Sequence, residues 1–426
     1  MEFKIKQSVL KEELGFIQGV VERKTTIPVL SNILIESIGE NEIRIVGTDL
    51  DVTIRCDAEA EIIKPGSICI QARKLFDIAR ALDPGDAHFK KEDNEWVTMK
   101  CGRANFRLAG VSRDQFPEIP QFKSTPMKLA ADVFSYMIRN TAFAITNEQS
   151  RFTLSGAKFI IGDGSAKMIT TDGHRLAYVE RAIDDKDGVM DTLIPKKALL
   201  ELVKISRGDG EVSFGEDTNH IYFETEGRLL ITRKLSGNFP NYEMVMPKDN
   251  DHSAIFDLEE MRNAVRRMSL IADERNRSIR LTIREGEIEV IAQSTEEGDG
   301  SEIVQADYTG EEIQLGFNWQ YLIEFLNNVG AGELAAYGDI AVRVSLRKLP
   351  SLRRRGGRRP GWFSRRDSPR TRRLTAHPHR LRIQRRQRPN PNVHRRREHL
   401  RLQRHRHAAA YLTERGHLAR KRRNAA

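Results

Sequence analysis

A unit of about 123 residues recurs along this chain, and this repeat constrains the fold more than any other feature. Phe116 recurs as Phe239, and the segment 75–78 (LFDI) recurs at 199–202 (LLEL) and at 322–325 (LIEF). A fixed period indicates one structural unit copied in tandem, and a period of this length is that of a whole domain. With 426 residues, the chain is long enough for about three domains.

Within each repeat, short strand-like runs alternate with helix-like segments. The runs are joined by Asp-Gly and Glu-Gly pairs, which are typical of hairpin turns. In the segment 72–82, Leu75, Ile78 and Ala79 form one apolar stripe at helical spacing. These patterns predict an α+β fold with antiparallel sheets. They also predict two helices in each repeat, near residues 8–22, 72–82, 130–144, 195–206, 258–272 and 318–329.

Charge is divided unevenly along the chain. Residues 347–426 hold 28 Lys and Arg against three acidic residues, whereas residues 1–346 hold 42 basic and 57 acidic residues, a net charge of −15. The acidic part still has basic helix faces in every repeat, for example at Arg73, Lys197 and Arg266. One such face alone is usually only solvated. Their recurrence predicts a positive surface that contacts nucleic-acid phosphates without reading sequence.

Catalytic motifs are nearly absent from the sequence. It contains no P-loop, HExxH, CxxC or GxSxG pattern. A hydrolase would use Asp172 to orient His174 as a base, but no nucleophile motif accompanies this pair. We favour instead a turn that holds Arg175 and Leu176 at the rim of a pocket. Seven of the 11 histidines lie in the Arg-rich end of the chain, without a frame for metal ligands. We therefore expect no metal and no cofactor.

The cysteines and the apolar runs indicate the compartment. Cys56, Cys69 and Cys101 lack the spacing of a disulfide framework, so we expect small, buried, reduced thiols. The N-terminal MEFKIKQSVL lacks the apolar core of a signal peptide. No apolar run approaches the ~20 residues that a membrane span needs. The sequence predicts a cytoplasmic protein with no membrane partner.

Several motifs resemble those of the bacterial sliding clamps, the beta subunits of DNA polymerase III. In order along residues 1–346, they are TIPVLSNILIE, QARKLFDIARAL, FRLAG, FPEIP, TTDGHRLA, RKLSGNFPNYEMVMP and GFNWQYLIEFL. The resemblance implies three clamp-type domains, at 1–125, 126–249 and 250–346. Their helices would line a pore and their antiparallel sheets would form the outside.

The resemblance also implies a task. Two protomers would join head to tail into a ring that encircles duplex DNA, slides along it and tethers the polymerase at high effective concentration. Such a ring makes and breaks no bond, so we expect a processivity factor and not an enzyme. The implied partners are DNA of any sequence, a second copy of the chain, and the polymerase catalytic subunit, clamp loader and repair polymerases, which bind through short peptides. The implied location is the cytoplasm, at the nucleoid during replication.

Residues at the matching positions of the family's sites follow from the same resemblance. The peptide pocket corresponds to Leu154, Thr171, Gly173, His174, Arg175, Leu176, Pro240, Val245, Asn318 and Tyr321. The dimer contact corresponds to Lys74, Phe106 and Leu108 in the first domain and to Leu270, Ile271 and Glu302 in the third. The DNA-facing residues correspond to Lys24, Arg73 and Arg80, to which the basic faces add Lys197 and Arg266. Met244 and Asn276 depart from the residues common in the family, Arg and Phe.

The resemblance ends at Leu346. In the family, the third domain continues through a final strand into a short Met-Pro-Met-Arg-like end. Residues 347–426 are instead rich in Arg, Pro, His and Ala and lack apolar stripes. This composition is typical of a GC-rich gene read in the wrong frame, so we expect an incomplete third domain and a disordered tail. The alternatives are a genuine basic extension that binds nucleic acid, or a frameshifted clamp without function.

Overall fold

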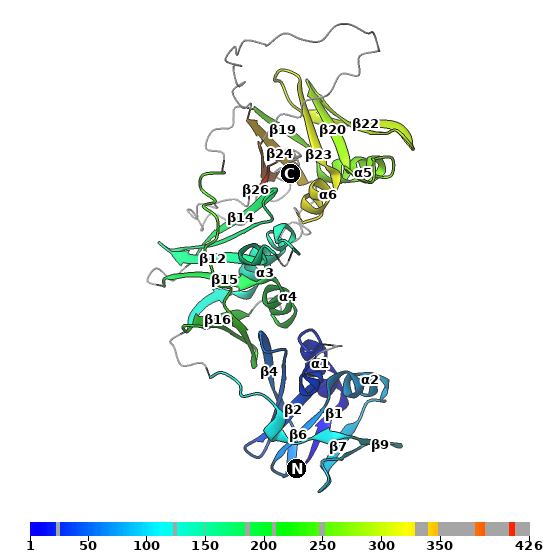
Figure 1. Cartoon of the computed structure of the whole chain (residues 1–426), viewed down its shortest axis with the longest axis vertical. Helices are drawn as coiled ribbons and strands as arrows, with labels where there is room; N and C mark the ends of the chain where they lie inside the picture. The colour runs from blue at the N-terminus through cyan, green and yellow to red at the C-terminus, as the bar shows by residue number, and fades with distance from the viewer. Residues whose placement is uncertain are drawn as a thin grey trace, which may run out of the picture. The chain divides into compact units, whose positions relative to one another are not determined.

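One order of helices and strands recurs along the chain in the computed structural model (Figure 1). The structure describes residues 1–22, 26–121, 126–148, 150–183, 188–206, 210–246 and 252–328, together with three later strands at 340–347, 380–387 and 409–413. In each repeat a strand leads into a helix, a block of strands follows, and a second helix leads into further strands. The tandem repeat predicted from the sequence is therefore confirmed.

The first repeat consists of β1 (Glu2–Lys6), α1 (Gln7–Ile17), β2 (Asn32–Ile38), β3 (Glu42–Thr48), β4 (Val52–Glu59), β5 (Glu61–Lys64), β6 (Ser67–Gln71), α2 (Ala72–Ala81), β7 (Asp86–Lys91), β8 (Val97–Cys101), β9 (Ala104–Leu108) and β10 (Gly110–Val111). The second consists of β11 (Met127–Ala130), α3 (Ala131–Arg139), β12 (Gly156–Gly162), β13 (Ser165–Thr171), β14 (Arg175–Ala182), β15 (Met190–Pro195), α4 (Lys196–Ile205), β16 (Glu211–Glu216), β17 (His220–Thr225) and β18 (Arg228–Arg233).

The third repeat consists of β19 (His252–Asp257), α5 (Leu258–Ser269), β20 (Ser278–Arg284), β21 (Glu287–Ser294), β22 (Gly298–Asp307), β23 (Ile313–Asn318), α6 (Trp319–Asn328) and β24 (Ile340–Arg347). Short 3-10 helices lie at Pro28–Ser31, Arg113–Gln115, Ala142–Ala144 and Phe152–Leu154. The helices predicted near 72–82, 195–206, 258–272 and 318–329 match α2, α4, α5 and α6 closely.

Two helices are shorter than the sequence predicts. The helix α1 ends at Ile17, and α3 ends at Arg139. After α3, the Asn140 side chain donates to the carbonyl of Tyr136 (2.8 Å), and the Thr141 hydroxyl donates to the carbonyl of Met137 (2.8 Å). These side chains compete with the backbone amides that would extend the helix. The apolar spacing continues beyond these points, which is why it overestimated the helix lengths.

The chain forms two compact units, one comprising residues 1–170 and 180–239, the other comprising 171–179 and 240–426. The first unit contains two repeats because β4 pairs with β18 and so joins their strands. The resulting sheet has the order β10-β6-β2-β3-β4-β18-β17-β16-β11. A smaller sheet, β5-β1-β7-β8-β9, completes the first repeat. The helix α1 packs against α2 and α4, so the helices of the two repeats meet within this unit.

The core of the first unit is closely packed. A Cβ on Gly47 of β3 would lie 2.4 Å from the Cγ2 atom of Ile17, so α1 approaches the sheet more closely than any other residue at position 47 would allow. In the second repeat, the rings of Phe134 and Phe159 pack edge to face at 5.2 Å, and Phe223 packs against Phe134 at 5.6 Å. Such aromatic pairs contribute beyond the area they bury.

The second unit has one long sheet. Within this unit the strand order runs from residues Arg175–Tyr178 of β14 through β26 (Ala409–Thr413), β25 (Arg380–Gln387), β24, β19, β22, β21, β20 and β23. The helices α5 and α6 pack against one another. This sheet positions the loop before β14 and the start of α6, which form the site described below.

The tail was expected to be disordered, and this expectation does not hold at β25 and β26. The strand β25 pairs with β24 along eight residues, with Val344 opposite Ile383. The strand β26 pairs with both β25 and β14. An open strand edge presents unpaired N–H and C=O groups to any extended segment, which explains how a sequence without apolar stripes enters a sheet. The other tail residues lie outside the described part of the chain.

Candidate functional site

The turn before β14 is fixed by the side chains of Thr171 and Asp172. The Thr171 hydroxyl donates to the carbonyl of Arg175 (2.6 Å) and accepts from the amide of Gly173 (3.1 Å). Asp172 Oδ1 accepts from the backbone amides of His174 (2.9 Å) and Arg175 (3.0 Å). Gly173 has a φ of 88°, which glycine adopts without strain. The turn predicted at this motif is therefore confirmed.

The same turn occurs one repeat earlier. Thr48 Oγ1 accepts from the amide of Leu50 (3.0 Å), and Asp49 Oδ1 accepts from the amides of Asp51 (3.0 Å) and Val52 (2.6 Å). Leu50 has a φ of 78°, in the position that Gly173 takes in the second repeat. The recurring Thr-Asp pair is thus a structural signature of the repeat. What differs between the copies is the set of side chains that the turn presents.

In the second repeat, the turn presents a buried arginine between two carboxylates. The side chain of Arg175 is 7% exposed. Its Nε donates to Asp172 Oδ2 (3.0 Å) and its Nη2 donates to Glu324 Oε2 of α6 (2.5 Å). The guanidinium also lies 4.6 Å from the ring centre of Tyr321, one turn earlier in α6. The ring of His174 stacks on the same Tyr321, with centres 5.9 Å apart and an angle of 22° between planes.

Most of the predicted peptide-pocket residues lie in this second unit. Thr171, Gly173, His174, Arg175 and Tyr321 meet at the turn, as described. Leu176 follows in β14 and is 4% exposed, and Asn318 ends β23, where its side chain accepts from the amide of Gln320 (2.9 Å). Pro240 and Val245 belong to the segment that leads to β19, and Tyr242 of this segment approaches Tyr178 of β14 (6.2 Å). Leu154 is buried in the first unit.

Sequence reasoning missed Glu324 as part of this site. A signal for it existed, because an acidic residue recurs at the same place in the second helix of each repeat, as Asp77, Glu201 and Glu324. The three carboxylates have different partners. Asp77 pairs with Arg73 and Glu201 with Lys204, both in their own helices, whereas Glu324 reaches Arg175. The periodicity indicates the position, but the partner depends on the fold.

The predicted dimer residues lie on two separate surfaces. Phe106 and Leu108 belong to β9, the last strand of its sheet, and Lys74 belongs to α2. At the other surface, Leu270 is 79% exposed at the end of α5, and Ile271 packs near Gly300 of β22. Glu302 of β22 accepts from Arg267 Nε (2.7 Å), and this hydrogen bond lowers the pKa of the Glu302 carboxyl.

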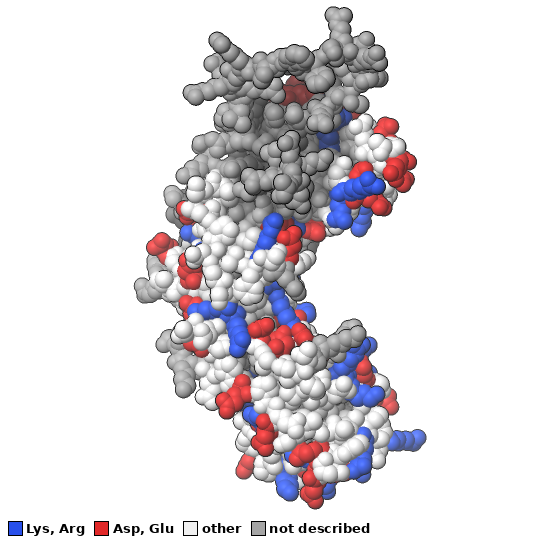
Figure 2. Space-filling model, viewed as in Figure 1, with Lys and Arg blue, Asp and Glu red and all other residues white. Residues whose placement is uncertain are grey.

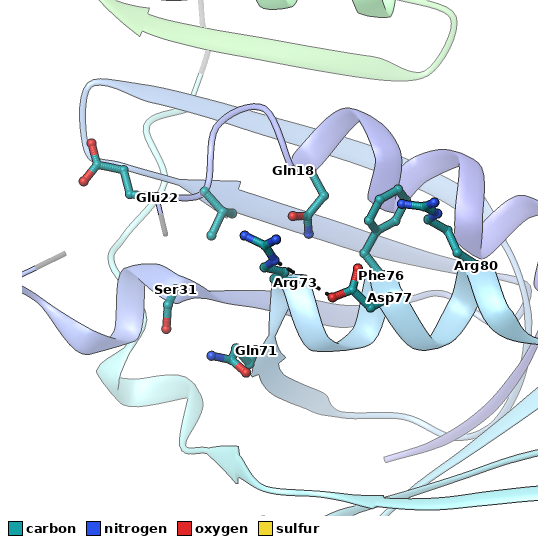
Figure 3. Close-up of a pocket in the computed structure, with 9 residues that line it drawn as sticks. Gln18, Glu22, Ser31, Gln71, Arg73, Phe76, Asp77 and Arg80 are labelled. Carbon is teal, nitrogen blue, oxygen red and sulfur yellow. Dashed lines mark ion pairs between the residues drawn. The ribbon is translucent and has the colours of Figure 1, made fainter. Parts of the chain in front are cut away.

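The predicted DNA-facing residues have different surroundings. Arg73 and Arg80 of α2 line a cavity of about 300 Å³, together with Gln18 at the end of α1 and Phe76 (Figure 3). Arg73 pairs with Asp77, which lies one turn later in α2 and also lines the cavity (3.9 Å). Figure 2 shows basic side chains over the region of α2, with acidic ones among them. This mixture is less uniform than the positive surface expected from the sequence.

The other residues predicted to face DNA differ in how accessible their charged groups are. Arg266 is exposed on α5. Lys197, in contrast, is bound within the chain, because its Nζ contacts the carboxylate of Asp49 and donates to the carbonyl of Val20 (3.0 Å). The charge of Lys197 therefore joins the second repeat to the first. Lys24 lies outside the described residues.

The described part of the chain contains no cluster of potential metal ligands and no helix able to cross a membrane. Among those residues, no group of three or more His, Cys, Asp and Glu side chains is arranged to hold a metal ion. The helices there are too short or too polar to cross a membrane. The cysteines Cys56, Cys69 and Cys101 are buried, and burial raises the pKa of the Cys69 thiol to about 11.

Comparison with known proteins assigns the chain to a family. Models of the N-terminal, central and C-terminal domains of the DNA polymerase III beta subunit match residues 1–120, 128–241 and 243–334. The beta sliding clamp of Pseudomonas aeruginosa is 32% identical over 341 residues, which cover 78% of this chain and 92% of that protein. The chain belongs to the bacterial sliding clamp family.

Other clamps agree with this assignment. The beta sliding clamp of Caulobacter vibrioides is 32% identical over 348 residues, covering 79% of this chain and 92% of that clamp. The crystal structure of the P. aeruginosa clamp bound to griselimycin superimposes with a TM-score of 0.79 at 26% identity, covering 97% of this chain and 98% of that one. The clamp fold and the resemblance drawn from the sequence motifs are thus confirmed.

Proposed function

We propose that this chain is a DNA sliding clamp, a processivity factor that tethers the replicative polymerase and performs no catalysis of its own. Membership of the family carries this proposal, because relatives named beta sliding clamp match along 92% of their length. We divide the chain into clamp domains at 1–125, 126–249 and 250–346, followed by the Arg-rich tail. The protein would act in the cytoplasm, at the nucleoid during replication.

The strand pairing within one chain supports a head-to-tail dimer. The last strand of the second repeat, β18, pairs with β4, the third strand of the strand block that follows α1. The equivalent strands that remain are β9, which is third after α2 as β18 is third after α4, and β22, third in the block of the third repeat. Within the described residues, β9 has a partner on one side only, and β22 meets β19 only at Ala306 and Asp307. Pairing of β9 with β22 of a second copy would repeat the β18–β4 contact.

Exposed apolar side chains support the same contact. Leu270 is 79% exposed and Ile303 of β22 is 54% exposed. A monomer gains nothing from apolar groups in water, whereas an interface buries them at ~25 cal/mol per Å². We therefore assign the dimer contact to Lys74, Phe106 and Leu108 on one copy and to Leu270, Ile271 and Glu302 on the other.

DNA would be held by non-specific phosphate contacts. We assign these to Arg73, Arg80 and Arg266, with Lys24 as a further candidate from the family resemblance. Contacts to phosphates give affinity without sequence information, and this is what sliding requires. Lys197 is withdrawn from the direct contacts, because Asp49 and the carbonyl of Val20 already hold its ammonium group.

Partner proteins would bind at the Arg175–Tyr321 site through short, partly apolar peptides. Tyr321 offers a partly exposed aromatic ring there, and the turn at 171–175 offers a fixed backbone, a combination suited to peptide binding. We assign the site to Leu154, Thr171, Gly173, His174, Arg175, Leu176, Pro240, Val245, Asn318 and Tyr321. The polymerase catalytic subunit, clamp loader and repair polymerases are the expected users. Griselimycin, bound by the P. aeruginosa clamp, is a ready probe.

Retention on circular DNA tests the proposed function. The full chain, loaded with ATP and the clamp loader of its own organism, should co-elute with a nicked circular plasmid and leave when the plasmid is cut. Leu270→Asp should give a monomer that is not retained, whereas Val189→Asp, which changes an exposed residue far from these strands in sequence, should behave as wild type. Retention on the linear plasmid, or retention of monomers, would contradict a topological clamp.

A further inference from the structure

The carboxylate of Glu324 joins two elements that are far apart in the sequence. It lies in α6 and accepts from Nη2 of Arg175, 149 residues earlier, at 2.5 Å. Glu324 itself is 43% exposed, whereas Arg175 is 7% exposed. One end of this ion pair therefore faces solvent at the site, while the other is held inside the turn. Any peptide bound beside Tyr321 would meet the exposed carboxylate first.

Glu324 and Tyr321 act on the turn together. They lie three residues apart in α6 and so share one face of the helix. Tyr321 contacts both the guanidinium of Arg175 (4.6 Å) and the ring of His174 (5.9 Å). An arginine can turn about its long side chain, so stacking alone would leave its position loose. The carboxylates of Asp172 and Glu324 hold it from two sides.

Arg175, Asp172 and Glu324 together carry one net negative charge, and of the three Glu324 is the most exposed. Arg175 carries one positive charge, and Asp172 and Glu324 carry two negative ones at distances of 3.0 and 2.5 Å from its nitrogen atoms. Two nitrogen atoms of the guanidinium, Nε and Nη2, are thus already engaged by carboxylates of the protein. A carboxylate on a bound peptide would compete with Glu324 for Arg175 and would be repelled by it.

We propose that Glu324 is a positioning and selectivity residue of the peptide site: it holds Arg175 over the ring of Tyr321 and disfavours peptides that place an acidic residue beside Arg175. The proposal rests on the proposed function, because it presumes that peptides bind here. The proposal implies that the preferred partner peptide is apolar and uncharged where it lies beside Arg175. Arg175 then serves as part of the wall and does not anchor a partner carboxylate.

Two peptides, three variants at Glu324 and Glu312, and Leu176→Asp test this proposal. The parent peptide is a nonapeptide without charged residues, selected from a display library for binding to the full wild-type chain. The second peptide differs from the parent only by one Asp, placed at its first or its last residue. Fluorescence anisotropy gives the dissociation constants for wild type, Glu324→Gln, Glu324→Asp and the control Glu312→Gln. Glu312 pairs with Arg284 elsewhere in the same unit, so the control removes the same charge at a distance from the turn.

The ratio of the two dissociation constants is the informative readout, because loss of folding would weaken both peptides alike. Removing one charge about 8 Å away should lower the penalty for Asp by about three- to fivefold in Glu324→Gln, and 0.5 M NaCl should shrink the difference. Glu324→Asp and Glu312→Gln should keep the wild-type ratio. Griselimycin serves as a second ligand on each variant.

The outcomes separate the two proposals. An unchanged ratio in Glu324→Gln, with the parent peptide still bound, would overturn the role of Glu324 and leave the peptide site intact. Parent peptide binding that survives Leu176→Asp, or its failure to bind wild type at all, would instead overturn the peptide site itself. The role of Glu324 would then fall with it.

Discussion

At the scale of single residues, burial sets the chemistry of the cysteines. Cys69 is 1% exposed on β6, in a cluster with Leu34, Val46 and Phe116. Burial raises the pKa of its thiol from the ordinary 9.0 to about 11. A thiol held protonated in this way is a poor nucleophile, since the thiolate is the reactive form. The residue therefore behaves as a small apolar side chain of the core, as its lack of motif spacing predicted.

Stability of the first unit should fall in alkaline solution because of Cys69. Below pH 9 the thiol is protonated in both the folded and the unfolded chain. Between pH 9 and 11 the unfolded thiol loses its proton while the folded one keeps it, so rising pH favours unfolding. We expect urea unfolding curves of Cys69→Ala to decline less over this range than those of wild type.

Val46→Ala provides the matched control for Cys69, because it opens space in the same cluster without removing a titrating group. It should lower the free energy of unfolding equally at pH 8 and pH 10.5. A Cys69→Ala chain whose stability declines as steeply as that of wild type between these values would contradict the assignment.

At the scale of elements, one buried arginine fastens α1 to the sheet of the next repeat. Arg228 begins β18, and its Nε and Nη2 donate to the two carboxylate oxygens of Glu13 at 2.9 and 2.6 Å. Both side chains are 9% exposed. The guanidinium also lies 4.4 Å from the ring centre of Phe16. Because two hydrogen bonds join the same pair of side chains, the contact fixes the orientation of α1 relative to β18 as well as the distance between them.

Removing this arginine should loosen the junction between the first two repeats. Arg228→Met leaves the Glu13 carboxylate buried without its cation, which costs about 3–5 kcal/mol of unfolding free energy. The double change Arg228→Met with Glu13→Gln should recover most of the loss. Arg284→Met, at an exposed ion pair, should change stability only slightly. Chemical denaturation measures all four chains, and equal losses in the single and double variants would contradict a specific pair.

The same scale shows what the sequence can predict. Helix α2 was found from the stripe of Leu75, Ile78 and Ala79, because burial on one face imposes a period on nearby residues. The Thr-Asp turn was found because its hydrogen bonds are local. The repeat pattern indicates the positions of Glu324 and Lys197, but it does not indicate which residues they contact. Their partners are 149 and 148 residues away, and no local period records such a distance.

At the scale of the whole molecule, the tail is where sequence and structure differ most. The sequence predicted that the third repeat would stop after residue 346, with a disordered tail. The structure continues its sheet through β25 and β26, so that three strands follow α6, as three follow α4 in β16, β17 and β18. The sequence of the tail shows that it lacks apolar stripes. It cannot report that a neighbouring strand edge is open, because that edge is formed by residues elsewhere in the chain.

DNA binding distinguishes the ring surface from the tail. Changing Arg73, Arg80 and Arg266 together to Gln should weaken binding to duplex DNA and reduce the salt dependence, by about 0.9 in log–log slope for each lost phosphate contact. Changing a matched number of tail arginines, Arg353, Arg354 and Arg355, to Gln should leave the loaded clamp on circular DNA. Filter binding at several salt concentrations measures the slopes. The opposite pattern would favour a nucleic-acid-binding tail over a clamp.

The pairing of β4 with β18 also has a consequence during synthesis. The edge of β4 is complete at residue 59, but its partner begins at residue 228. At roughly 5–20 residues per second, a ribosome needs on the order of 10–30 s to supply that partner. For this time the first repeat emerges with a bare strand edge, next to other nascent copies on the same messenger RNA. The pairing that joins two repeats into one compact unit therefore also leaves the newborn chain with an edge that chaperones would have to protect.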